Sequence, residues 1–153
     1  MHTAVTSRLA EAGLTLPPGP AALGRYVPAT IAGRMVFTSG QLPMHDGTLV
    51  ATGIVGADLT PDDAHRAAER CALNALAAAS TVCDLDTVSH VVKLTVYVAS
   101  SPGFTAQPTV ADGASAVLIA AFGEAGAHAR EAIGVAALPL GAPVEVSLIL
   151  EVD

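Results

Sequence analysis

Two charged residues near the end of the chain, Arg130 and Glu145, have the types and spacing to form a small-molecule site. They lie in residues 128–152, HAREAIGVAALPLGAPVEVSLILEV, which read as two strands joined by a turn, so both side chains are expected at the same end of a sheet. A guanidinium that stays charged at neutral pH can bind a carboxylate through two parallel hydrogen bonds. The residues alone leave two hypotheses open: a ligand site, or a structural cross-strand ion pair.

The other reactive side chains form weaker patterns. Cys71 and Cys83 belong to no CxxC pair and no His/Cys cluster with zinc spacing, so we expect free thiols, no metal site and a reducing compartment. Ser39 is typical of a turn at a strand end, and no histidine has a sequence reason to lie beside it, so no Ser/His/Asp triad is predicted. His128 is the histidine expected closest to Arg130.

Composition and charge argue against several classes of function. The formal net charge is −7, and Lys93 is the only lysine beside six arginines, so no basic surface is available for nucleic acid. Aromatic residues make up 3%, which removes the stacking platforms of single-strand binders. The sequence has no apolar run of signal-peptide length near its start and no long charge-free apolar span. We therefore expect a soluble, cytoplasmic protein that binds neither nucleic acid nor membranes.

Periodicity predicts a single domain preceded by an arm. The predicted elements, in chain order, are a helix at 4–13, strands at 34–40 and 49–56, a helix at 61–82, a strand at 89–100, a helix at 111–126, and strands at 131–137 and 143–152. The first two strands are predicted to pair as a hairpin, because HDGT at 45–48 is a tight-turn signal. A Pro/Gly-rich connector follows the first helix, so we divide the chain into an arm, residues 1–23, and one domain, residues 24–153.

The order ββαβαββ after the arm predicts an α+β fold, with a mixed sheet and two helices on one of its faces. Hydrophobic residues make up 52% of the chain and charged residues 14%, so too little charge is available to solvate the opposite sheet face. We expect the same face of a neighbouring subunit to cover it, in a homo-oligomer.

Several segments resemble the Rid/YjgF family of reactive-intermediate (enamine/imine) deaminases. The C-terminal signature R-x-x-[IV]-x-V-x-x-LP followed by VEV is matched from Arg130 to Pro139 and from Val144 to Val146. Further matches are Gly24 and Tyr26 in GRYVP, and Ser39, Gly40, Gln41 and Pro43 in VFTSGQLP. The resemblance covers about residues 24–152.

The resemblance implies a chorismate-mutase-like fold, a homotrimer and three ligand clefts, each between adjacent subunits. It implies that Arg130 grips a substrate carboxylate, that Glu145 positions the attacking water, and that Tyr26, Ser39 and Gly40 line the cleft. The implied ligand is a small carboxylate-bearing imine or enamine, or the corresponding keto acid. No metal and no organic cofactor are implied.

The chain departs from the usual family pattern in two places. It carries about twenty extra N-terminal residues, and Asp112-Gly113 occupies the region where shorter members often place an asparagine on the helix facing the cleft. An acidic residue there would repel a carboxylate or occupy Arg130 itself.

Two functions stay open from the sequence. One is a hydrolase of the 2-iminobutanoate/2-iminopropanoate deaminase type, which releases ammonia and a 2-keto acid. The other is a trimeric module that binds small carboxylate metabolites without turning them over. The RNA-cleaving or translation-inhibiting role attached to some relatives is disfavoured by the charge of the chain.

Overall fold

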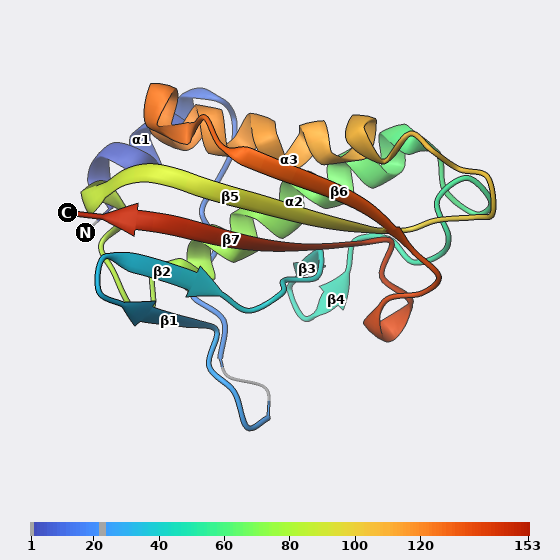
Figure 1. The fold of residues 1–153 in the computed structure, drawn as a ribbon, viewed down its shortest axis with the longest axis horizontal. Coiled ribbons are helices and arrows are strands. Elements are labelled where there is room, and N and C mark those ends of the chain that lie inside the picture. Colours follow the sequence, from blue (N-terminus) through green and yellow to red (C-terminus); the bar gives the residue numbers. More distant parts are fainter. Residues whose placement is uncertain (1, 22–23) are drawn as a thin grey trace.

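The computed structural model describes residues 2–21 and 24–153 as a five-stranded sheet with helices packed on one face (Figure 1). The strand order is β1-β2-β7-β5-β6, in which β5 and β6 run parallel and the other neighbours run antiparallel. The α-helices and strands are α1 (Thr3–Glu11), β1 (Ala29–Ala32), β2 (Met35–Thr38), β3 (Met44–His45), β4 (Thr48–Leu49), α2 (Pro61–Ala79), β5 (Val88–Ala99), α3 (Gln107–Phe122), β6 (Ala129–Val135) and β7 (Val144–Val152). Short 3₁₀ helices are η1 (Leu85–Thr87), η2 (Gly123–Gly126) and η3 (Pro139–Gly141). The architecture is the mixed α+β type predicted from the sequence.

Helix α2 begins where its N-terminal residues predict. Thr60 and Asp63 form a capping box, in which the Asp63 N–H donates to Thr60 Oγ1 and the Thr60 N–H donates to Asp63 Oδ2, both at 3.1 Å. Helix α3 begins at Gln107, before the predicted position 111, and ends before Gly123, whose φ is 60°. No helix in residues 2–21 or 24–153 is long and apolar enough to cross a membrane.

Strands β5 and β7 divide their side chains between the two faces of the sheet. In β7, Val144, Val146, Leu148 and Leu150 are buried towards the helices, whereas Glu145, Ser147, Ile149 and Glu151 lie on the face without helices. In β5 the pairing register shifts between Val91 and Lys93. Because of this irregularity Val91 joins Leu94, Val96 and Val98 in the core, although strict alternation along the strand would place Val92 there.

The pairing of the early strands differs from the sequence prediction. The segment at 34–40 does contain a strand, β2, but its hairpin partner is β1, which precedes it across a turn at Gly33 (φ 61°). The predicted HDGT turn also forms, with Asp46 and Gly47 at positive φ. It joins only the two-residue strands β3 and β4, so most of the predicted strand at 49–56 lies outside the sheet.

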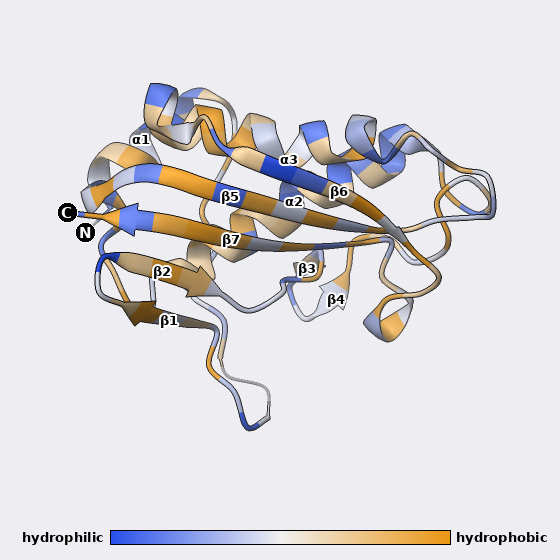
Figure 2. Cartoon of the chain, in the orientation of Figure 1, coloured by the Kyte–Doolittle hydropathy of each residue, from blue (hydrophilic) through white to orange (hydrophobic). Residues whose placement is uncertain are grey.

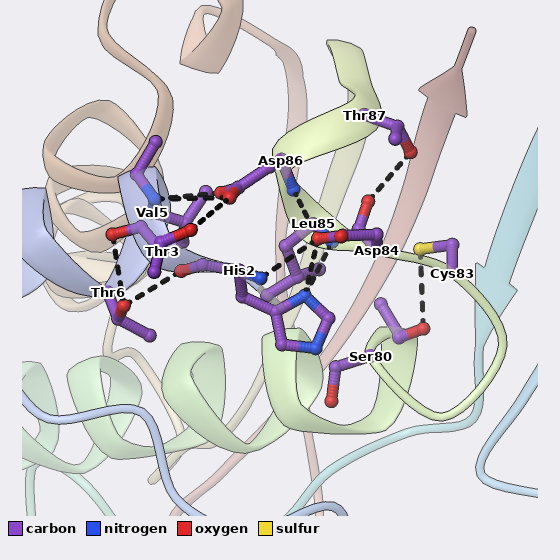
Figure 3. A network of polar contacts seen from close by, with 12 residues as sticks. His2, Thr3, Val5, Thr6, Ser80, Cys83, Asp84, Leu85, Asp86 and Thr87 are labelled. Carbon is purple, nitrogen blue, oxygen red and sulfur yellow. Dashed lines mark hydrogen bonds and ion pairs between the residues drawn. The ribbon is translucent and has the colours of Figure 1, made fainter.

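Helix α1 packs onto the domain. Val5 and Leu9 are fully buried and belong to the same apolar core as residues of α2, α3 and the sheet. The first turn of α1 is anchored to η1 (Figure 3), where the Val5 N–H donates to Asp86 Oδ1 at 2.9 Å and the Ala4 N–H donates to Asp86 Oδ2 at 3.1 Å. The division at residues 23 and 24 stays a prediction, but the arm contributes apolar side chains to the core.

The strands of the sheet carry both hydrophobic and hydrophilic residues (Figure 2), and the strand registers place residues of both kinds on the helix-free face. The register places Phe37, Ile149, Tyr97, Glu145 and Ile133 on this face. Phe37 and Ile133 are 39% and 38% exposed in the single chain, while the salt bridge between Lys93 and Glu131 supplies charge beside them. The expectation that a neighbouring subunit covers this face remains a prediction.

Candidate functional site

Arg130 lies on the edge strand β6 and reaches helix α3. It pairs in register with the buried Leu94, which places it on the helix-covered face of the sheet. Its Nη1 donates to Asp112 Oδ1 at 2.7 Å and to Ser115 Oγ at 3.2 Å. The Asp112 side chain is 62% exposed and the Arg130 side chain 27%. The acidic residue that the sequence flags near Arg130 therefore does contact it.

Asp112 engages only one nitrogen of the guanidinium. Within the described part of the chain, Nε and Nη2 of Arg130 have no hydrogen-bond partner. These two nitrogens form the side edge of the guanidinium, which can make two parallel hydrogen bonds with one carboxylate. The contact with Asp112 thus leaves the two-pronged edge of Arg130 available.

Glu145 lies on the opposite, helix-free face of the sheet, in register with Tyr97. Burial raises the pKa of its carboxyl above the ordinary value of 4.5. Gly40 lies directly against this carboxylate, since a Cβ at position 40 would be 2.9 Å from Glu145 Cδ and would overlap Oε1. Glu145 is therefore a partly desolvated carboxylate in a close-fitting environment.

The structure does not bring Arg130 and Glu145 together within one chain. Strand β5 separates β6 from β7, and the two side chains lie on opposite faces of the sheet. The hypothesis of a cross-strand ion pair between them is wrong, because they do not occupy neighbouring strands and the ionic partner of Arg130 is Asp112. The expectation that both reach the same end of the sheet is also wrong, because Arg130 pairs with Leu94 in the middle of β5 and Glu145 pairs with Tyr97 near its end. A shared site would need Arg130 from one copy and Glu145 from another.

Ser39 and Gly40 connect strand β2 to the segment that crosses beside β7. Ser39 Oγ donates to the Val27 carbonyl at 2.7 Å and the Ser39 N–H donates to Pro28 O at 2.8 Å. Ser39 therefore holds the segment before β1 against the end of β2. Immediately after it, Gln41 exchanges two backbone hydrogen bonds with Val146. These bonds fix Gly40 beside Glu145.

Tyr26 and Gly40 line a cavity of about 500 Å³ between the connector and helix α2. Tyr26 is 56% exposed at its edge. Residues lining the cavity include the prolines 17, 18, 20 and 28, with Leu42, Met44, Arg70, Asn74, Ala77 and Leu140. Arg130, Glu145 and Ser39 do not line it. Of the five predicted site residues, the structure brings Gly40 next to Glu145, places Tyr26 and Gly40 on the same cavity, and leaves Arg130 apart.

Sequence reasoning missed Arg70 and Asn74, two polar residues that helix α2 contributes to this cavity. Arg70 Nε donates to the Met44 carbonyl at 2.6 Å, and Asn74 Nδ2 donates to the carbonyls of Leu42 and Met44 at 2.9 and 3.0 Å. Both lie inside an alanine-rich helix whose pattern indicates core packing. A polar side chain at position 74, on the buried face of that helix, was the available signal.

Comparisons with known proteins agree on one family. Residues 6–152 match the family model described as "YjgF/chorismate_mutase-like, putative endoribonuclease". The chain is 44% identical to "Protein TCP17" of Trypanosoma cruzi over 97% of its own length and 94% of that protein. Its fold is similar to that of Atu1372, a protein of unknown function from Agrobacterium tumefaciens, with a TM-score of 0.91 and 44% identity over 99% of this chain and 94% of that one.

A more distant solved relative carries a ligand. E. coli TdcF, solved with bound serine, superposes with a TM-score of 0.62 and 25% identity over 90% of this chain and 94% of that one.

Proposed function

Because this chain belongs to the Rid/YjgF family, we propose that it hydrolyses enamine or imine intermediates derived from amino acids, releasing ammonia and a 2-keto acid. Water is the only co-reactant that such a reaction needs. The observation that carries the proposal is the side edge of Arg130, because Nε and Nη2 have no partner within the described residues and can bind a substrate carboxylate.

Glu145 is the proposed base. A carboxyl group whose pKa is raised by burial takes a proton more readily than an ordinary glutamate once it is ionised. The water oxygen bonds to the imine carbon while Glu145 accepts one water proton and passes it to the nitrogen. The second proton follows as the carbon–nitrogen bond breaks, so ammonia leaves and a keto group remains.

A homotrimer is the proposed way to unite the two residues. Glu145 lies on the helix-free face with the exposed Phe37 and Ile133, whereas Arg130 lies at the β6 edge. If the helix-free face of one copy packs against the edge of the next, Arg130 of one copy meets Glu145 of its neighbour. Burial of Phe37 and Ile133 favours this packing.

The alternative is a trimeric module that binds carboxylate metabolites without turnover. The bound serine in E. coli TdcF favours it, because serine carries a carboxylate and has no imine to hydrolyse. In such a module Arg130 keeps its role and Glu145 has none. Replacing Glu145 by Gln would then leave carboxylate affinity unchanged.

The test is release of ammonia and keto acid from freshly generated 2-aminoacrylate and its longer-chain analogues. In Arg130→Lys the charge remains but the two-pronged geometry is lost, so we expect turnover to fall at least ~10-fold, equivalent to ~1.4 kcal/mol of transition-state stabilisation. Arg70→Lys is the matched variant, because Arg70 lies in the cavity with Tyr26. A loss of turnover in the Arg70 variant with an unchanged Arg130 variant would assign the carboxylate to the cavity and refute the role of Arg130.

A further inference from the structure

A continuous chain of hydrogen bonds leads from the backbone to Arg130. His128 Nδ1 lies 2.6 Å from the Gly126 carbonyl, and His128 Nε2 lies 2.9 Å from Ser115 Oγ. Ser115 Oγ in turn lies 3.2 Å from Arg130 Nη1. Ser115 is on α3, one turn after Asp112, and His128 lies between η2 and β6. The hydrogen-bond network therefore links α3, the end of η2 and β6.

The direction of every hydrogen bond in this network follows from the one that the Gly126 carbonyl accepts. A carbonyl oxygen can only accept, so Nδ1 of His128 carries the proton. In the neutral imidazole Nε2 is then an acceptor, and the Ser115 hydroxyl donates to it. The serine oxygen is left to accept from the permanently charged Arg130 Nη1. In each of these three hydrogen bonds one donor therefore faces one acceptor.

We propose that Ser115 and His128 are positioning residues for Arg130, which hold its guanidinium by Nη1 so that the Nε and Nη2 edge is presented to a carboxylate. This inference rests on the proposed binding role of Arg130. Asp112 alone orients Arg130 weakly, because its mostly exposed carboxylate is well solvated and such ion pairs contribute little. Ser115 and His128 are partly buried, and His128 is tied to the Gly126 carbonyl, so together they restrict the rotation that Asp112 permits.

The His128 tautomer tests the inference without any substrate. Two-dimensional ¹H–¹⁵N spectra of the imidazole, recorded at a pH where the ring is neutral, distinguish a proton on Nδ1 from one on Nε2. We expect the proton on Nδ1 in the wild-type protein and in Ser115→Ala. A proton on Nε2 would make His128 a donor to Ser115 and would overturn the proposed hydrogen-bond network.

If Ser115 and His128 position Arg130, their loss should weaken carboxylate binding. Titration with pyruvate, followed by NMR, measures this affinity. We expect Ser115→Ala and His128→Ala each to weaken pyruvate binding by about 3- to 10-fold, the size of one lost hydrogen bond of ordinary strength. Ser115→Thr, which keeps the hydroxyl, should restore most of the affinity lost in the alanine variant. His90→Gln is the control, since His90 is exposed on β5 and outside this chain of hydrogen bonds.

The two hypotheses fail in different ways. Wild-type protein that binds pyruvate but releases no ammonia from 2-aminoacrylate would refute the proposed deaminase activity and leave the positioning role intact. Folded Ser115→Ala and His128→Ala variants that bind pyruvate as tightly as wild type would refute the positioning role, whatever the activity. In active protein we also expect these variants to raise KM more than they lower kcat, because they disturb binding of the carboxylate.

Discussion

Gly40 is held against the carboxylate of Glu145 with no room for a side chain between them. A Cβ at position 40 would lie 3.2 Å from Glu145 Cγ and 2.9 Å from Cδ. Its backbone does not have positive φ, so space rather than conformation requires glycine here. The two backbone hydrogen bonds between Gln41 and Val146 prevent the backbone at Gly40 from moving away from Glu145. The position of Glu145 therefore depends directly on the residue at position 40.

Gly40→Ala should displace the Glu145 carboxylate while preserving the fold. We expect a stability loss of about 1 to 2 kcal/mol, typical of local overpacking, and a fall in imine turnover of at least ~10-fold. Urea unfolding and ammonia release measure the two effects. The shorter side chain of Glu145→Asp should relieve the clash, so Gly40→Ala should destabilise the Glu145→Asp background less. Equal losses in both backgrounds would contradict the contact.

The pH dependence of stability should report the raised pKa of Glu145. Because burial raises this pKa in the folded state, the folded protein binds the proton more tightly than the unfolded chain. Ionised Glu145 therefore destabilises the fold above its folded pKa, and this cost disappears as the pH falls below the unfolded value. We expect Glu145→Gln to be more stable than wild type at pH 8 and no more stable at pH 3, measured by urea unfolding. A stability difference between Glu145→Gln and wild type that did not change with pH would contradict the raised pKa of Glu145.

The same residue should control how turnover depends on pH. If Glu145 accepts a proton from water, activity should rise with pH as its carboxyl ionises, at a higher pH than for an ordinary glutamate. Glu145→Gln should abolish this rising limb and lower turnover by about 100-fold or more, the usual contribution of a general base. Steady-state kinetics across the pH range measure both. Retention of the rising limb in the glutamine variant would exclude Glu145 as the base.

Local sequence patterns predicted the elements that depend on local rules. The Thr60–Asp63 box and Pro61 place the start of α2, and strict alternation predicts β7, because capping and the two-residue period act within a few residues. The strand at 34–40 is confirmed by β2, but its predicted pairing is wrong, because HDGT is the stronger turn signal although the turn at Gly33 forms the longer hairpin. Composition alone could not identify which turn belongs to the main sheet.

Strand order was the information that the sequence lacked at the site. Arg130 and Glu145 are close in sequence and were placed at one end of the sheet, yet β5 inserts between their strands. Such non-local pairing is decided by the packing of whole elements, which no motif near either residue encodes. Ser115 was missed for a related reason, since nothing in the pattern of α3 indicates contact with Arg130.

Helix α1 should depend on Asp86 for its attachment. Desolvation acts to raise the pKa of Asp86, but the N–H groups of Val5 and Ala4 lower it below its ordinary value. This contribution is present above the unfolded pKa and is lost as the pH falls through the folded one. We expect Asp86→Asn to cost about 1 kcal/mol at pH 7, as for a lost helix cap, and less at pH 2. Glu11→Gln, an exposed carboxylate on the same helix, should change little, and equal effects of the two variants would contradict this anchor.

Asp112 should tune the affinity of Arg130 for anions without blocking it. Its carboxylate contacts Nη1 alone, so a bound ligand need not displace it, but its negative charge opposes a second carboxylate nearby. We expect Asp112→Asn to strengthen pyruvate binding by about 2- to 5-fold, the scale of an exposed charge interaction, and the gain to shrink in high salt. Stability should change by less than about 1 kcal/mol, because Asp112 is mostly exposed. A gain above ~100-fold would mean that Asp112 occupies the binding edge itself, and weaker binding would mean that it orients Arg130 more than it repels the ligand.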